Sequence, residues 1–119
     1  MSWTVRILQF LIGVGFLLFG FMKVSGDPTQ VEAFAEIYGY GTGFMYAVGA
    51  IEVLAAVGLL LGFWKKKLVP VFSSVLVVVM AGAILTHIRA DQGFDVIVIP
   101  LVLLVLCMLL FLGHRKMRN

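Results

Sequence analysis

The chain has 119 residues, of which 62% are apolar and 13% are charged, and its mean hydropathy is +1.12. A soluble domain of this size has too little interior to hide so much apolar surface, so the composition argues against a soluble protein and predicts a single-domain integral membrane protein over residues 1–119. The net charge of +3 gives no reason to expect a nucleic-acid partner.

Four apolar segments predict an all-α membrane protein, an antiparallel bundle of four transmembrane helices. The segments cover about residues 7–22, 44–64, 68–88 and 94–112. A helix needs about 20 apolar residues to cross about 30 Å of hydrocarbon. The first segment is shorter, but Arg6 and Lys23 bracket it and can extend toward the polar interface. No A-x-A-like site follows this segment, so we expect a span rather than a cleaved signal peptide.

The basic residues predict how these spans are oriented. If the spans alternate in direction, one side carries only Lys23 and Arg89. The other side carries Arg6, Lys65, Lys66, Lys67, Arg115, Lys116 and Arg118. By the positive-inside rule, this asymmetry predicts that both termini lie in the cytoplasm.

The longest connection, residues 24–43, is predicted to contain a short amphipathic helix. We expect Thr29 to be its N-cap, with Glu32 as the second half of a capping box. Apolar side chains then share one helical face, namely Val31, Phe34, Ala35 and Tyr38. We expect this helix to lie on the outer surface of the bundle, in the loop between the first two spans, or to cover the bundle as a lid.

The strongest functional signal is Glu52, the one charged residue within residues 44–64. A charge in the middle of a span costs about 2.5–3.5 kcal/mol on insertion scales, so such a residue usually faces protein or water and has a function. Gly49 and Ala56 share its helical face, and small residues let another helix approach closely, which places Glu52 inside the bundle. Two interpretations stay open: a carboxyl group that holds helices together, and one that handles a substrate, proton or ligand.

The third span adds Met80 and His87 on one helical face. Because the second and third spans run antiparallel, Met80 is expected at the depth of Glu52 and His87 near the outer surface. The Glu52 carboxyl and the His87 imidazole would then be about 10 Å apart in depth, where they could flank a bound molecule or share a chain of waters. Histidine titrates near pH 6.5, which suits a proton acceptor, so Glu52 and His87 are the candidate catalytic residues.

Three residues are candidate ligand contacts: Lys23, Met80 and Tyr46. Lys23 closes the first span on the outer side, where it either extends to lipid headgroups or pairs with Glu52. Tyr46 is expected near the outer interface as an aromatic anchor. Arg89 is expected to be a solvated loop charge.

Several chemistries lack the residues that they need. Cys107 is the only cysteine, which argues against a C-x-x-C redox pair, and we expect it to be a small packing residue in the fourth span. The two histidines do not form a metal or haem site with the cysteine or the acidic residues, so we expect no metal. We also expect no tightly bound cofactor.

Three segments carry a resemblance to a known family. They are Phe19–Val24, which ends the first span with Gly-x-x-Lys, Glu52–Gly62 in the second, and Met80–His87 at the end of the third. Together with Arg6 and four spans, their order and spacing resemble the DoxX family of small bacterial membrane proteins.

The resemblance implies a four-helix bundle in the bacterial cytoplasmic (inner) membrane. Some family members are associated with sulfur oxidation that feeds electrons to quinone, and others with quinone stress or membrane oxidoreductase complexes. Lys23, Glu52 and His87 match recurring polar positions of the family. The expected partners are the lipid bilayer, a membrane redox protein and, as an open alternative, a second copy of the chain.

Three hypotheses for the function follow. We favour a small subunit that binds a quinone-like or other hydrophobic molecule between its helices and works with a membrane oxidoreductase, with Glu52 and His87 handling protons. The alternative is a non-catalytic assembly or accessory protein, in which Glu52 and Lys23 hold helices together. A small proton-coupled transporter is favoured least, because small multidrug exporters carry their membrane glutamate in the first helix.

Overall fold

The computed structural model describes residues 2–37, 39–90 and 93–118, and these ranges contain helices and no strand. The elements are α1 (Ser2–Val24), α2 (Pro28–Glu32), the π-helix η1 (Ala33–Ile37), α3 (Thr42–Leu61), α4 (Leu68–Arg89) and α5 (Phe94–Arg118). Four of them, α1, α3, α4 and α5, are long and apolar enough to cross a membrane. The predicted all-α bundle of four membrane helices is therefore confirmed.

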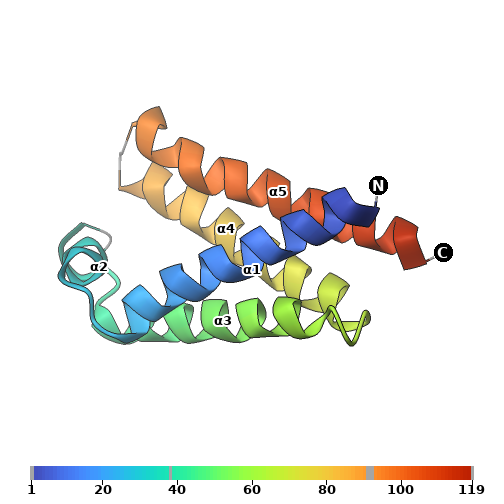
Figure 1. Ribbon diagram of the computed structural model, residues 1–119. Helices are drawn as coiled ribbons and strands as arrows, with labels where there is room; N and C mark the ends of the chain where they lie inside the picture. Colours follow the sequence, from blue (N-terminus) through green and yellow to red (C-terminus); the bar gives the residue numbers. More distant parts are fainter. Residues whose placement is uncertain (1, 38, 91–92, 119) are drawn as a thin grey trace.

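The four long helices form two pairs (Figure 1). α1 packs along α3, α4 packs along α5, and the pairs meet through α3 with α4 and α1 with α5. The start of α1, the end of α5 and the turn between α3 and α4 lie at one end of the bundle, which we call the terminal end. α2 and η1 lie at the other end, which we call the lid end.

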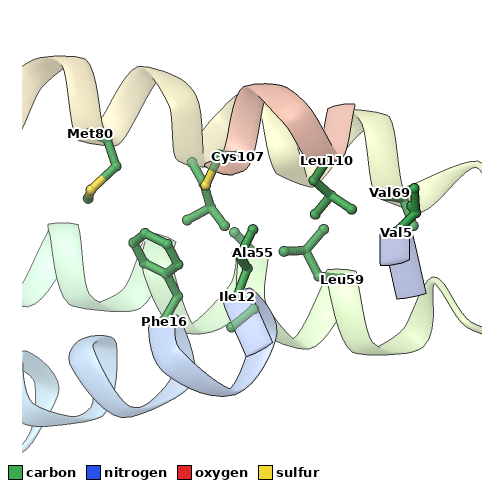
Figure 2. Close-up of a cluster of buried hydrophobic side chains, with 11 residues drawn as sticks. Val5, Ile12, Phe16, Ala55, Leu59, Val69, Met80, Cys107 and Leu110 are labelled. Carbon is green, nitrogen blue, oxygen red and sulfur yellow. The ribbon is translucent and has the colours of Figure 1, made fainter. Parts of the chain in front are cut away.

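The core between the pairs contains side chains from all four long helices (Figure 2), including Ile12, Phe16, Ala55, Leu59, Leu76, Cys107 and Leu110. Cys107 is completely buried there and acts as a packing residue, as predicted. The outward faces are apolar as well: Leu54 is 66% exposed and Val78 is 71% exposed. A helix that is apolar on both its inner and outer faces suits a bundle whose solvent is lipid.

α1 and α3 come into backbone contact at a pair of glycines. A Cβ atom on Gly20 would lie 2.8 Å from the Gly49 carbonyl oxygen, and one on Gly49 would lie 2.9 Å from the Gly20 carbonyl oxygen. The face of α3 that contains Gly49, Glu52 and Ala56 is buried, as its small residues predicted. The close approach of these two helices positions the functional site described below.

α1 extends past the apolar segment 7–22 at both ends and contains the bracketing residues Arg6 and Lys23. One prediction about the helix ends is wrong. α2 begins at Pro28 and its N-cap is Asp27, whose side chain accepts a hydrogen bond from the Gln30 amide, so Thr29 as N-cap is wrong. The physical reason is that Pro28 has its φ angle preset for the first helical position, and an aspartate directly before it is a good cap.

The predicted short helix between the first two spans is present as α2 and η1, and it covers the lid end. Phe34 is buried under it, with its ring centroid 6.3 Å from that of Phe44 at the start of α3. The backbone then turns through Gly39 and Gly41, whose φ angles are +74° and +85°. Tyr38, which was assigned to the apolar face, lies outside the described residues.

Candidate functional site

A cavity of about 730 Å³ lies between the two helix pairs, on the lid side of the core. Residues from all four long helices line it, together with residues from α2 and η1, which we call the lid, and from the loop before α3. Most of the lining side chains are apolar. Met80 belongs both to this lining and to the core, where it stands at the lid end of the row of side chains in Figure 2. A volume of this size lies within the range of small-molecule sites, about 300–1,000 Å³.

An ion pair lies in the wall of this cavity. The ammonium nitrogen of Lys23, on the last turn of α1, is 2.9 Å from Glu52 Oε1 in the middle of α3. The Glu52 side chain is only 3% exposed and the Lys23 side chain 13%, so both charges are removed from bulk solvent. Of the two roles that the sequence left open for Lys23, the structure shows the pairing with Glu52.

The glycine contact explains how Lys23 reaches Glu52. A Cβ atom on Gly49, nearly one turn before Glu52, would lie 2.6 Å from the Cβ of Lys23. The stem of the lysine therefore crosses α3 where α3 has no side chain, and its ammonium group can descend to the depth of the carboxylate. Any larger residue at position 49 would push α1 away and lengthen the ion pair.

Four of the five residues predicted for the site line the cavity: Lys23, Glu52, Met80 and His87. Met80 is almost fully buried, and His87 is half-buried on the last turns of α4. The fifth, Tyr46, is 45% exposed on α3 and does not line the cavity; its hydroxyl group lies close to Gly26 in the connection between α1 and α2.

A second polar group in the cavity wall was not anticipated from the sequence. The Tyr40 hydroxyl is 3.0 Å from Thr86 Oγ1, and Arg89 Nη1 donates a hydrogen bond of 3.0 Å to the same hydroxyl. Arg89 was expected to be a loop charge, but it is the last residue of α4 and its guanidinium lies 5.5 Å from the centroid of the Tyr40 ring. In the sequence, Tyr40 lies between two glycines, Gly39 and Gly41, and this was the feature that could have pointed to the contact.

Gln9 is another buried polar residue that the sequence analysis passed over. It is 2% exposed, and its amide nitrogen donates a hydrogen bond of 2.6 Å to the carbonyl oxygen of Leu59 near the end of α3. This bond ties α1 to α3 at the terminal end, far from the cavity. The signal was the same as for Glu52, a polar residue inside an apolar span.

The described residues contain no group of three His, Cys, Asp or Glu side chains that could hold a metal ion. The polar groups that line the cavity are the Lys23–Glu52 ion pair, the His87 imidazole, and Tyr40 with its partners Thr86 and Arg89. These groups surround an apolar space, which suits recognition of a molecule that is largely apolar and carries a few polar atoms.

Comparison with known proteins places this arrangement in a family. Residues 7–110 match the model of the DoxX-like family. The chain is also 30% identical over 103 residues to a protein of Bacillus subtilis (strain 168), "Uncharacterized protein YdgD", with 86% of this chain and 90% of that protein covered. No solved structure gives a significant match. The match includes α3 and α4, most of α1 and α5, and every residue assigned to the cavity, and the chain belongs to the DoxX-like family.

Proposed function

We propose that this protein binds a small molecule of the quinone class in the cavity and that it works as a subunit beside a membrane oxidoreductase. The observation that carries the proposal is an apolar cavity of about 730 Å³ with the Lys23–Glu52 ion pair in its wall. Burying a charged pair costs free energy, and ionisable residues inside membrane spans usually mark functional sites.

The ion pair suits both redox forms of such a ligand. A lysine ammonium has three donors and the contact with Glu52 occupies one, which leaves donors for a quinone carbonyl oxygen. The Glu52 carboxylate can in turn accept a hydrogen bond from a quinol hydroxyl group. The apolar wall, for example Phe19, Ile51 and Ile99, would hold the ring and its hydrocarbon chain.

Proton transfer is the second part of the proposed role. Reduction of a quinone to a quinol takes up two electrons and two protons, and we assign the electrons to the partner oxidoreductase. Glu52 is placed to exchange a proton with the ligand, and His87 lies nearer the lid end, where a chain of waters would link it to the surface. Support for the partner comes from the DoxX resemblance, because some family members are associated with membrane oxidoreductases.

A binding experiment tests this function. The protein in lipid nanodiscs is titrated with a short-chain ubiquinone by isothermal calorimetry. Ala83→Phe, which fills the cavity, is expected to weaken binding by at least about tenfold, or about 1.4 kcal/mol. The matched control is Ala50→Phe, the same change at an exposed α3 position outside the cavity lining, which should bind like the unmodified protein. Equal binding by the two variants, or no binding by the unmodified protein, would contradict the proposal.

One observation favours a second candidate, a non-catalytic assembly or accessory protein. The Lys23–Glu52 pair and the Gly20–Gly49 contact lie side by side at the α1–α3 interface, as expected of groups that hold two helices together. In this case Glu52→Ala would lower the amounts of folded protein and of its partner, and the titration would show no ligand. The calorimetric result therefore separates the two functions.

A further inference from the structure

At the lid end of the cavity, the loop before α3 contacts the last turn of α4. We call this contact, made by Tyr40, Thr86 and Arg89, the Tyr40 latch. All three side chains line the cavity, and Thr86 lies one turn beyond Ala83 in the cavity wall. The latch joins residues 46 positions apart in the sequence and connects the lid to the α4–α5 pair.

Two hydrogen bonds make the latch. Arg89 Nη1 donates to the Tyr40 hydroxyl oxygen at 3.0 Å, and the Tyr40 and Thr86 hydroxyl groups share a hydrogen bond of 3.0 Å in which either can be the donor. Tyr40 and Thr86 are half-buried and Arg89 is exposed, so water can replace each partner when the contact breaks. The latch can therefore open without disturbing the helix core.

Tyr40 lies between two glycines with positive φ angles, which allow the loop to turn at this point. Gly39 and Gly41 adopt φ angles of +74° and +85°, a region that favours glycine. A Cβ atom on either glycine would meet no atom within 4 Å, so the conformation and not a lack of space requires glycine there. The amides of Tyr40 and Gly41 both donate to the Phe34 carbonyl oxygen, at 3.0 and 3.1 Å, which ties the loop to η1.

We infer that the Tyr40 latch is a gate that controls access to the cavity from the lid end. In the structure, Tyr40 is held against α4 by Thr86 and Arg89. In the proposed open state, the loop and η1 move away from these two residues and widen access to the cavity for water at the lid end. This inference goes beyond the proposed function and does not depend on which molecule the cavity binds.

Cysteine accessibility tests the gate without any ligand. Ala83→Cys, made in a Cys107→Ala background, puts a thiol in the cavity wall, and its reaction with a charged, water-soluble maleimide is followed in nanodiscs. If the closed and open states exchange rapidly, the rate is proportional to the open fraction. Tyr40→Phe keeps the ring and removes the hydroxyl group, and it should raise the rate about fivefold or more, as expected for the loss of one to two hydrogen bonds.

The control thiol is Gly43→Cys, at an exposed position on the first turn of α3 where a Cβ meets no atom within 4 Å and which is outside the cavity lining. Its rate should not respond to Tyr40→Phe. Thr86→Val, which removes the other hydroxyl group, should reproduce the effect at Ala83→Cys and replaces Tyr40→Phe if that variant fails to fold. An unchanged rate at Ala83→Cys, or an equal increase at Gly43→Cys, would overturn the gate.

Discussion

Glu52 is stabilised inside the bundle by one partner, the Lys23 ammonium at 2.9 Å. The two side chains are not equivalent, because Glu52 is 3% exposed in the middle of α3 while Lys23 is 13% exposed at the end of α1. A lysine that loses its partner can extend toward the lid end and regain water. A glutamate at the depth of Glu52 is too short to reach water. The two single substitutions should therefore lower the free energy of unfolding by different amounts.

We therefore predict that Lys23→Met lowers the free energy of unfolding by about 3 kcal/mol or more, since it leaves a buried charge without a partner. Glu52→Leu should cost less. The double variant, Lys23→Met with Glu52→Leu, should recover much of the loss, because it replaces the pair by apolar residues of similar size. Unfolding in mixed micelles, followed by circular dichroism, measures all three. Additive losses in the double variant would show that the two charges do not stabilise each other.

At the scale of elements, the α1–α3 contact determines the geometry of the site. Gly20 and Gly49 let the two backbones touch, and this approach brings Lys23 over α3. A side chain at Gly20 would meet backbone atoms, the Gly49 carbonyl oxygen and the Val53 amide nitrogen at 2.8 and 2.9 Å, which cannot move aside as a flexible side chain could. The helices themselves would have to separate.

Gly20→Ala is consequently expected to lower the free energy of unfolding by about 1–3 kcal/mol, the usual cost of overpacking. Gly15→Ala is the matched control on the same helix, because a Cβ there meets no atom within 4 Å. It should be neutral or should stabilise the protein by about 0.5–1 kcal/mol through helix propensity. The same unfolding measurement compares the two, and an equal effect at both positions would contradict the close approach.

Those parts of the fold and of the site that depend on a local pattern of residues could be predicted from the sequence. Hydropathy and helical periodicity predicted the four long helices and the buried face of Glu52, because both depend on residues within a few turns of each other. The contact of Tyr40 with Thr86 could not be predicted, since the two residues are 46 positions apart and no repeating pattern links them. Gln9 was overlooked for a different reason: an uncharged amide in a span is a weaker signal than a carboxylate.

At the scale of the whole molecule, the basic residues are distributed unevenly between the two ends of the bundle. The turn between α3 and α4 holds Lys65, Lys66 and Lys67 at the terminal end, whereas the lid end carries Lys23 and Arg89. We propose on this basis that the terminal end faces the cytoplasm and the lid end the opposite side of a bacterial inner membrane. The cavity and its gate would then open away from the cytoplasm.

A pair of carboxyl-terminal fusions checks this orientation. A fusion to green fluorescent protein should fluoresce in cells, and a fusion to alkaline phosphatase should be inactive, because both reporters would lie in the cytoplasm. The converse result, an active phosphatase and a dark fluorescent protein, would place the lid end in the cytoplasm and reverse the direction proposed for ligand access.

We propose that the cavity beside Lys23 and Glu52 holds a hydrophobic molecule of the quinone class. Native mass spectrometry of the protein extracted gently from its own membrane tests this claim most directly, with Ala83→Phe and Ala50→Phe analysed in parallel. We predict an adduct with the mass of a quinone on the unmodified protein and on Ala50→Phe, and its loss from Ala83→Phe. A protein that carries no adduct, or an adduct that persists equally in Ala83→Phe, would contradict the account.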